Sequence, residues 1–574
     1  MKRRTFVAGL LGSAAFAFGP RPLFSAVPRN SVWDELSRRV GPRLIPVNSP
    51  LVASARTGGA GSDALFKALK NPYYLGDEPS LTQSLGWTDA WTSQPSVMAI
   101  AAESASDVAA AVEVARKHKL RLVVKGGGHS YFGNSNAADS LLIWTRRMDS
   151  VELHDHFVPN GAPSGAQGEA AASVGAGAIW GRVYDAVAVK GGRYIQGGGC
   201  LTVGVAGFAQ GGGFGSLSKQ FGTGAGNLLE AEIVTADGQI RVVNAYRDPD
   251  LFFALRGGGG GTFGIVTRLT FRTHPLPEQI GATLFSVEAT TDQAWRALVA
   301  RTIAFYSSDL FNPHWGEQLR FSGRKLQVTM VCHGLSQAEI EAAWEPLLGW
   351  IGEGKSDYRF TMEPAFFAVS GRRFWDPEFL RSIPGLVLQD TRPGAPASNI
   401  FWASNLSETA QVLHAYQSAW LPKDLLKPER QASLVHAIAS ASAEWTVTLH
   451  TNKGLAGGSD YALRSTAETA MSPEVLDAFA LLICAADGPP AWPGIPGHEP
   501  DVEEGRKEAV SVARAMGPIR ALVPNAGSYV SEADYFQRNW KQAYWGRHYA
   551  RLEQIKGKYD AGNLFHGHQT VGSK

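Results

Sequence analysis

The chain has 574 residues, of which 44% are hydrophobic and 18% are charged, a composition typical of globular proteins. This length exceeds what one ordinary hydrophobic core organises, so we expect two or more domains. Lysine and arginine number 54 against 52 aspartates and glutamates, and a net charge of +2 gives no reason to expect a nucleic-acid partner. The 64 glycines form clusters without a fixed period, which excludes a collagen-like chain and argues against a simple repeat protein. The clusters lie at 126–128, 197–199, 211–213 and 257–261.

The N-terminus has the pattern of a targeting signal. Basic residues at 2–4 precede an apolar run, 6–18, which is too short to span a bilayer comfortably. The sequence Arg3-Arg4-Thr5-Phe6 matches the start of a twin-arginine signal, with cleavage expected near Ala17 or Ala26. We therefore predict a signal peptide over 1–26, the twin-arginine export machinery as a partner, and a periplasmic or extracellular mature protein without a membrane span. The alternative is a chance basic start before a core helix.

The three cysteines are too few, and odd in number, for a disulfide framework. Cys332 and Cys484 stand in apolar runs and are expected to be buried strand residues. Cys200 differs because it ends the run Gln196-Gly-Gly-Gly-Cys200. His129 likewise ends Lys125-Gly-Gly-Gly-His129. Two reactive side chains thus follow glycine triplets, and the two segments are best interpreted together.

A strand–helix–strand unit is predicted around the first triplet. Residues 97–102 suit a buried strand, Ser104 begins a capping box with Asp107, and apolar residues then recur at helical spacing. A second strand is expected over 120–124. The glycines follow the carboxyl end of that strand, where open α/β sheets bind their ligands.

A second glycine pattern invites the wrong interpretation. Residues 259–264 fit the GxGxxG pattern of nicotinamide dinucleotide sites, which should follow a strand and open a helix. Here the preceding segment, 250–256, has helical character, and 265–273 alternates as a strand does. The order is reversed, so we reject a nicotinamide site.

The remainder of the chain changes in character. From 277 to 520 the glycine triplets disappear and helical stretches alternate with strands, one of which is expected over Glu444–His450. This region is predicted to be a second, substrate-binding domain, followed by a charged and aromatic segment at 521–574. Residues 27–92 form a lead-in segment without a clear motif.

The order of the motifs resembles that of a known family. The motifs are Lys125–Asn134, Gly199–Gly207, Gly211–Gly215, Asn227–Gly238, Asp250–Gly258, Tyr544–Leu552 and Ile555–Asp560. In order and spacing they resemble the FAD-linked oxidases of the berberine bridge enzyme and oligosaccharide oxidase type, within the vanillyl-alcohol-oxidase group. The resemblance implies an α+β fold with a two-subdomain, PCMH-type FAD-binding domain over 93–276. It also implies an α/β substrate domain with an antiparallel sheet, and a C-terminal segment that returns to the FAD domain.

The resemblance also implies a doubly tethered FAD. His129 takes the place of the histidine bonded to the flavin 8α-methyl carbon, and Cys200 that of the cysteine bonded to C6. An imidazole and a thiolate are nucleophiles able to add to an oxidised, electrophilic ring. The alternative is a turn histidine beside a buried cysteine.

Further positions are carried over as FAD contacts, most of them through the backbone, with an ordinary turn or packing role as the alternative for each. They are Gly126, Gly127, Gly128, Ser130, Gly133, Asn134, Gly204, Gly207, Asn227, Ile265 and Val266. Val203 occupies the place where a valine leaves oxygen a path to the flavin. Phe208 departs from the family, because a polar residue often binds the flavin carbonyl edge there. Ser531 replaces the asparagine of the family's Tyr-x-Asn.

The predicted function is an FAD-dependent oxidoreductase, and an oxidase is favoured. Hydride would pass from an alcohol, sugar or ring C–H substrate to flavin N5, and oxygen would then be reduced to hydrogen peroxide. Candidates for the catalytic base are Tyr529 first, then His450 and Glu444, which strand alternation would place on one face. The alternative acceptor is a quinone or cytochrome, which would make the protein a dehydrogenase. No metal ligand set and no Gly-x-Ser-x-Gly hydrolase elbow stands out.

Overall fold

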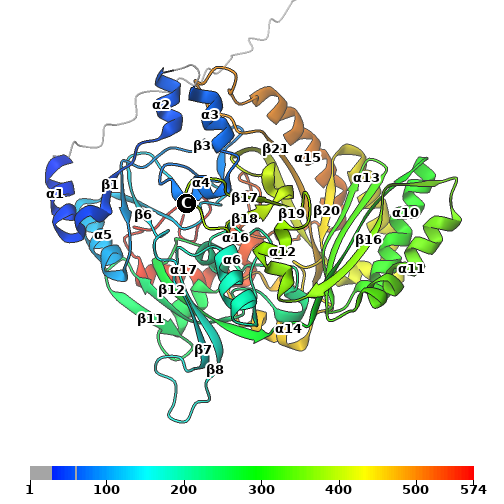
Figure 1. Ribbon diagram of the computed structural model, residues 1–574, viewed down its shortest axis with the longest axis horizontal. Helices are drawn as coiled ribbons and strands as arrows, with labels where there is room; N and C mark the ends of the chain where they lie inside the picture. Colours follow the sequence, from blue (N-terminus) through cyan, green and yellow to red (C-terminus); the bar gives the residue numbers. More distant parts are fainter. Residues whose placement is uncertain (1–28, 58–60, 574) are drawn as a thin grey trace, which may run out of the picture.

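The protein is described by a computed structural model that covers residues 29–57 and 61–573. The predicted signal peptide, 1–26, lies outside the described residues. In Figure 1 the first half of the chain forms the left part of the molecule, and a large sheet with its helices forms the right part. No helix in the described ranges is long and apolar enough to cross a membrane.

The region predicted to bind FAD, 93–276, is called the FAD side below. Within it, a small four-stranded sheet carries the first glycine triplet. Its order is β1 (Leu44–Pro46), β4 (Met98–Ala101), β6 (Ser140–Trp144) and β5 (Arg121–Lys125). The last three are parallel, and α5 (Ala105–His118) packs against α1 (Arg29–Val40) on their outer side. The predicted strand–helix–strand unit is confirmed, including the capping box of Ser104 and Asp107. One feature differs from the simplest arrangement, because β6 lies between the two predicted strands and pairs with both.

A second sheet of the same domain is antiparallel. Its order is β11 (Ile240–Asn244), β10 (Leu228–Val234), β12 (Ile265–Pro275), β8 (Glu169–Gly175) and β7 (Val151–Phe157), and β9 (Arg193–Ile195) also pairs with β12. The helix α9 (Pro249–Leu255) precedes the glycines at 257–261, and the strand β12 follows them. The predicted order of helix, glycines and strand is confirmed, and it is the reverse of the order that a nicotinamide site needs.

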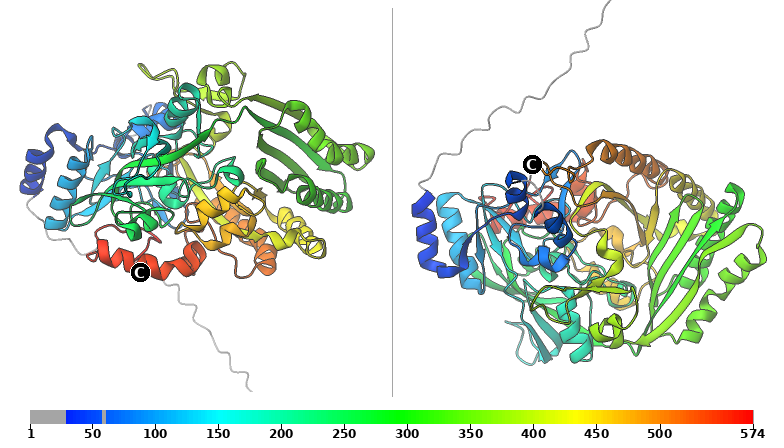
Figure 2. Two further views of the ribbon diagram at one scale, coloured as in Figure 1. Left: turned by 90° about the horizontal axis from the view of Figure 1, so that it is seen from below. Right: turned by 45° about the horizontal axis from the view of Figure 1, so that its top comes forward.

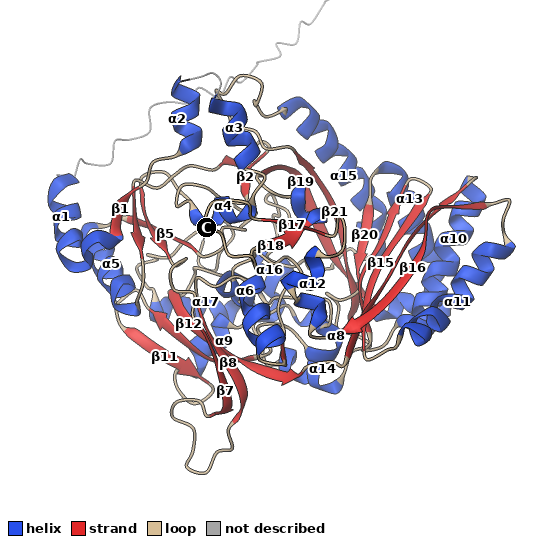
Figure 3. Ribbon diagram, viewed as in Figure 1, coloured by secondary structure: helices blue, strands red, loops and turns tan. Residues whose placement is uncertain are grey.

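The region predicted to bind substrate, called the substrate domain below, is built on a nine-stranded sheet, most of which is seen on the right of Figure 3. Its order is β16 (Tyr358–Ser370), β13 (Gln279–Ala289), β15 (Lys325–His333), β14 (Trp315–Ser322), β20 (Val447–His450), β21 (Ala478–Gly488), β19 (Gln411–Pro422), β2 (Ser84–Trp87) and β3 (Trp91–Thr92). Four helices pack against it: α10 (Asp292–Phe305), α11 (Gln337–Glu353), α13 (Pro428–Glu444) and α15 (Val502–Leu522). Cys332 and Cys484 are buried in β15 and β21, as expected.

The lead-in segment is divided between the two domains. Its strand β1 joins the sheet of the FAD side, whereas β2 pairs in parallel with β19 of the substrate domain. Between them, α4 (Pro72–Asp77) begins at an Asn71 cap. The segment therefore ties the two domains together.

The predicted strand over Glu444–His450 is wrong in its first half. The helix α13 continues to Glu444, and β20 begins only at Val447. The physical reason is the apolar spacing of Leu434, Ile438 and Ala441, which buries one face of the helix against the sheet. Glu444 is consequently an exposed residue at the end of a helix.

The C-terminal segment returns to the FAD side, as the views in Figure 2 show for its red helices. Its helices are α16 (Trp540–Trp545) and α17 (Tyr549–Tyr559), and α17 packs against α9. The indole of Trp545 donates a hydrogen bond to the carbonyl of Gly257 at 2.9 Å. The mixed helices and antiparallel sheets agree with the α+β fold expected from the sequence.

Candidate active site

The two glycine motifs cross at van der Waals distance. A Cβ on Gly127 would lie 2.5 Å from the backbone nitrogen of Gly204, and a Cβ on Gly204 would lie 2.5 Å from that of Gly127. A Cβ on Gly126 would lie 3.2 Å from the carbonyl oxygen of Ala176. These positions need glycine because protein backbone fills the space, so any contact they make with a cofactor would be through their own backbone atoms.

This crossing brings His129 and Cys200 to the same threonine. The hydroxyl oxygen of Thr202 lies 3.3 Å from Nε2 of His129 and 3.6 Å from Sγ of Cys200. The imidazole and the sulfur therefore cannot be farther apart than the sum of these two distances. Residues 71 positions apart in the chain thus converge on one point, as the paired triplets predicted.

The surroundings set the ionisation of both side chains. Burial lowers the pKa of His129 to about 4, so the imidazole is neutral and keeps a lone pair at ordinary pH. Burial also raises the pKa of the Cys200 thiol, and the negative charge of Glu408 raises it further. The sulfur is a thiol in this state and needs a proton acceptor before it can act as a nucleophile.

A small cavity adjoins both side chains. It is lined by Pro72, Gln83, Ser84, His129, Tyr131, Cys200, Thr202, Phe401, Asn405, Glu408, Thr409 and Gln411. Two of its polar atoms, Oγ of Ser84 and Oδ1 of Asn405, are buried without a hydrogen-bond partner in the described chain. Buried polar atoms are normally paired, so these two are available to a molecule bound in the cavity.

Other features fit a large planar cofactor. A Cβ added to Gly207, in α7 (Val205–Gly211), would meet no atom within 4 Å, and the same holds for Gly199 and Gly261. Gly199 and Gly207 are exposed, whereas the residues on either side of them are buried or partly buried. Open space beside glycines, orphaned polar atoms, a neutral imidazole and a thiol are together compatible with FAD.

Three predicted contacts near the first motif have partners in the protein. The amide of Asn134 donates to the carbonyl of His568 at 3.3 Å and accepts from its backbone N–H at 2.9 Å. The Ser130 hydroxyl accepts from the backbone N–H of Asn134 at 3.3 Å. Gly133 has a φ of +71°, and a Cβ there would meet the ring of Trp91 at 2.7 Å. Asn134 therefore holds the C-terminal segment against the loop 126–134, called the tether loop below, in which Gly128 also has a positive φ, +76°.

Asn227 is fully engaged by the protein. Its amide nitrogen donates to the carbonyls of Phe221 at 2.7 Å and Thr223 at 2.8 Å. Its oxygen lies 2.8 Å from the Tyr461 hydroxyl and 2.7 Å from Nε2 of His274. This buried side chain has no bonding capacity left for a cofactor, which favours the structural alternative for Asn227.

Ile265 and Val266 also have a structural setting. They begin β12, pair with β10 through Val234 and Ile233, and their side chains are buried in the core. Their side chains face protein, which makes packing their evident role.

Val203 and Phe208 lie in or beside the second motif. Val203 is partly buried, and its carbonyl accepts the backbone N–H of Trp180 at 3.1 Å. Phe208 packs edge-on against Trp180, with ring centroids 5.0 Å apart. A Cβ on Gly213 would meet the Phe208 ring at 2.4 Å, so this aromatic side chain fills space that the glycine leaves open.

The three predicted bases lie in different surroundings. The Tyr529 hydroxyl accepts the backbone N–H of Gly213 at 3.1 Å, and burial raises its pKa to about 12. His450 lies on β20, where burial lowers its pKa well below its usual value, and its Nδ1 is buried without a partner in the described chain. Glu444 does not share a strand face with His450, so the structure removes the reason for choosing it.

Sequence reasoning missed several residues in or beside the cavity. Tyr131 and Tyr416 pack together with ring centroids 5.1 Å apart, and Tyr131 lines the cavity. Glu408 has part of its surface open to solvent, but many protein atoms lie around its side chain. This enclosure, followed by the negative charge of Asp487, raises its pKa to about 7. Tyr131 stands two residues after His129, which was a usable signal. Glu408 belongs to an irregular connection that carries no motif.

Comparisons with known proteins identify the family of this chain. A family model described as FAD binding domain matches residues 97–244, and one described as Berberine and berberine like matches 528–572. An FAD-linked oxidoreductase, easE, of Trichophyton verrucosum is 31% identical over 486 residues, covering 83% of this chain and 73% of the relative. The chain therefore belongs to the FAD-linked oxidoreductases of the vanillyl-alcohol-oxidase and berberine bridge enzyme type, and it is an FAD-binding enzyme.

Particular relatives extend the comparison. The VAO-type flavoprotein oxidase VAO615 of Thermothelomyces thermophilus is 29% identical, covering 82% of this chain and 75% of the relative. A crystal structure of the VAO-type flavoprotein MtVAO615 from Myceliophthora thermophila superimposes with a TM-score of 0.77 at 24% identity, over 96% of each chain. Glucooligosaccharide oxidase from Acremonium strictum, described with a 6-S-cysteinyl, 8α-N1-histidyl FAD, shares the fold with a TM-score of 0.62 at 20% identity, over 83% of this chain and 92% of its own.

Two substitutions separate structural from cofactor-binding roles. Asn227→Ala should lower the free energy of unfolding by about 3 kcal/mol, because several buried groups lose their partner. Urea unfolding would measure this loss, and the FAD content per folded molecule should remain unchanged. Gly207→Ala, in which the new methyl group enters open space, should keep the stability and lose FAD. Loss of FAD without loss of stability in Asn227→Ala would contradict the assignment.

Proposed function

We propose that this enzyme is an oxidase whose FAD is tethered through His129 and Cys200. When bound, FAD takes two electrons from a substrate C–H bond and passes them to an acceptor. The observation that carries the proposal is the convergence of the imidazole and the sulfur on Thr202. The tethered FAD of glucooligosaccharide oxidase, which has the same fold, supports it.

The side chains present are suited to both bonds. A neutral imidazole offers its lone pair at ordinary pH, and a thiol becomes a nucleophile once it loses its proton. Forming either bond releases two electrons and two protons, which the acceptor of the enzyme's own reaction takes up. The backbones of Gly126, Gly127, Gly128 and Gly204, with Ser130 and the open face of Gly207, would hold the rest of the cofactor.

The tethers can be tested on the unfolded holoenzyme. Acid-precipitated protein should stay yellow, and mass spectrometry should find flavin on both the His129 and the Cys200 peptide. Cys200→Ala should retain the histidyl flavin and shift its visible spectrum, and His129→Ala should do the converse. Release of all colour into the supernatant would defeat the tethering proposal.

Dioxygen is the proposed electron acceptor. Val203 is a partly buried aliphatic residue three positions after Cys200, at the turn that carries the thiol. A larger side chain there would narrow the path by which dioxygen reaches the flavin from that side. One relative, VAO615, is described as an oxidase, which supports this choice over a quinone or cytochrome.

Replacement of Val203 tests the acceptor. Val203→Leu should slow reoxidation by oxygen by about tenfold, a change of about 1.4 kcal/mol in the barrier, while substrate reduction changes little. Stopped-flow absorbance would follow the two half-reactions separately. Equal slowing of both would count against a role for Val203, and dye reduction without peroxide formation would favour a dehydrogenase.

Glu408 is our proposed proton acceptor from the substrate hydroxyl, in place of the first sequence candidate, Tyr529. Its pKa of about 7 is close to ordinary pH, and its solvent-accessible carboxylate lines the cavity beside His129 and Cys200. Tyr529 is 7% exposed and its pKa of about 12 favours the neutral phenol. Asp487, Glu532 and Lys453 are the other charged groups that act on Glu408.

The pH dependence of turnover distinguishes the two candidates. The wild-type rate should rise as pH increases through about 7, because Glu408 must be deprotonated to accept a proton. Glu408→Gln should abolish this ionisation and lower kcat by about 10²–10⁴. Tyr529→Phe serves as the comparison. If Tyr529→Phe removes the ionisation and Glu408→Gln does not, the base is the tyrosine.

The substrate class follows from the same chemistry. We propose a small molecule with an oxidisable C–H bond beside a hydroxyl group, an alcohol or a sugar, or a ring C–H compound. Tyr131 supplies aromatic surface in the cavity for such a ring, and Tyr416 packs against Tyr131. Export through a twin-arginine signal stays a prediction from residues 1–26. A peroxide screen over alcohols, sugars and alkaloids would identify the compound.

A further inference from the structure

The turn that carries Cys200 is held from both domains. The hydroxyl of Tyr184, in α6 (Trp180–Tyr184) of the FAD side, donates to the carbonyl of Gly198 at 2.9 Å. The indole of Trp402, in β18 (Ile400–Trp402) of the substrate side, donates to the carbonyl of Gly199 at 2.7 Å. Gly199 itself is exposed, and a Cβ there would meet nothing within 4 Å. Packing therefore does not fix the peptide on that side, and directional hydrogen bonds must do so.

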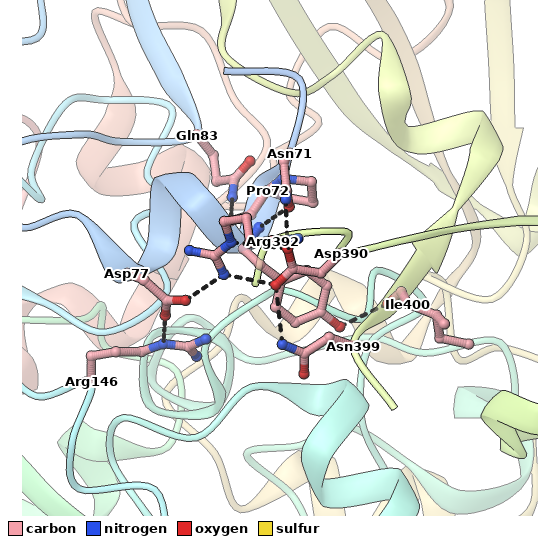
Figure 4. Close-up of polar contacts among 10 residues, drawn as sticks. Asn71, Pro72, Asp77, Gln83, Arg146, Asp390, Arg392, Asn399 and Ile400 are labelled. Atoms are coloured by element: carbon pink, nitrogen blue, oxygen red, sulfur yellow. Dashed lines mark hydrogen bonds and ion pairs between the residues drawn. The ribbon is translucent and has the colours of Figure 1, made fainter. Parts of the chain in front are cut away.

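Trp402 belongs to a hairpin that is anchored elsewhere. Strand β18 pairs with β17 (Val387–Gln389), and the loop between them reaches α4 in the lead-in segment (Figure 4). Asp390 in this loop has a fully buried side chain. It accepts hydrogen bonds from Arg392 at 2.7 and 2.9 Å and from Asn71 at 2.8 Å.

The anchor continues into the FAD side. Arg392 also donates to Asp77 at 2.7 Å, and Asp77 accepts from Arg146 at 2.9 Å, which Figure 4 shows as a chain of alternating charges. The hydroxyl of Tyr73 donates to the carbonyl of Ile400 at 2.7 Å, two residues before Trp402. Charge-assisted, paired hydrogen bonds of this kind fix position as well as add stability. These hydrogen bonds fix the position of the hairpin, and its last residue, Trp402, contacts the turn that carries Cys200.

We propose that Trp402 is a positioning residue for the second flavin tether: its indole N–H holds the Gly199 carbonyl so that Cys200 faces the cofactor. This inference rests on the proposed bicovalent FAD and names the group that makes the sulfur bond form efficiently. The histidyl bond does not depend on it, because His129 lies on the other motif. Because the hairpin is bonded to the lead-in segment, the position of that segment also determines where Trp402 holds the turn of Cys200.

The test compares the two tethers in one protein. Trp402→Phe keeps an aromatic ring and removes the donor. Soon after expression, its share of Cys200 peptide carrying flavin should fall by about fivefold relative to wild type, the factor that one neutral hydrogen bond is typically worth. The share of His129 peptide carrying flavin should be unchanged. Mass spectrometry of the digested holoenzyme gives both values without any activity measurement.

Matched variants exclude general damage. Trp350→Phe removes an indole from α11, where Trp350 packs on Tyr358 at the β16 edge of the nine-stranded sheet, and it should leave both tethers at wild-type level. Trp402→His restores an N–H donor on a smaller ring and should recover part of the loss. Arg392→Lys, which cannot make the paired contact to Asp390, should lower the cysteinyl share in the same direction as Trp402→Phe.

The outcomes separate the two proposals. If wild-type protein carries no flavin on Cys200, the bicovalent function fails and the role of Trp402 fails with it. If the wild type carries both tethers and Trp402→Phe retains the full cysteinyl share, only the role of Trp402 is overturned. Equal loss of both tethers in Trp402→Phe would show damage to FAD binding in general, and would also overturn it.

Discussion

The close crossing of two backbones, at Gly127 and Gly204, is the constraint on which the rest of the site depends. Each residue leaves room for the other only because neither has a Cβ. Since His129 follows the first glycine by two residues and Cys200 precedes the second by four, the crossing fixes how far apart their reactive atoms can be. Thr202, between the two, contacts both side chains. The fold thus builds a two-point attachment from main-chain contact, without a preformed salt bridge between the two side chains.

Lys125, the residue before the first triplet, stabilises this crossing through hydrogen bonds to the lead-in segment. Lys125 ends β5 with a buried side chain, and its ammonium donates to the carbonyls of Glu78, Pro79 and Leu81 at 2.9, 2.7 and 2.9 Å. Burial lowers its pKa to about 7, and the three carbonyls offset part of the cost of burying a positive charge. The same lysine therefore joins the tether loop to the lead-in segment, which in turn carries the strand β2 into the substrate domain. One buried side chain connects the cofactor motif to the element that spans both domains.

The sequence was most informative where local chemistry decides the structure. The capping box at Ser104, the periodicity of α5 and the reversed order around 257–261 were all readable, because each depends on neighbouring residues. The pairing of His129 with Cys200 came from motif order and family resemblance. Topology was less accessible: nothing local shows that β6 inserts between β4 and β5, because that pairing is set by a segment some twenty residues later.

The assignments that the structure disfavours, corrects or adds have a common physical origin in tertiary contacts. Asn227 had the place of a cofactor contact, but Phe221, Thr223, Tyr461 and His274 use all of its hydrogen-bonding capacity. Glu444 looked like part of a strand until the burial of α13 extended the helix over it. Glu408 had no signal, because its raised pKa comes from enclosure by segments distant in the chain.

The turn that carries Cys200 is held by both domains at once. The carbonyls of Gly198 and Gly199 accept hydrogen bonds from Tyr184 on the FAD side and Trp402 on the substrate side. Adjacent carbonyls on one peptide segment cannot both keep their donors if the two domains shift relative to each other, since a hydrogen bond weakens steeply with misalignment. The geometry of the cysteine turn therefore depends on how the two domains dock against each other. Docking in turn depends on the buried Asp390 and its partner Arg392, far in sequence from either glycine motif. The site is complete only when the lead-in segment, both domains and the hairpin are in register, which is why no single motif defines it.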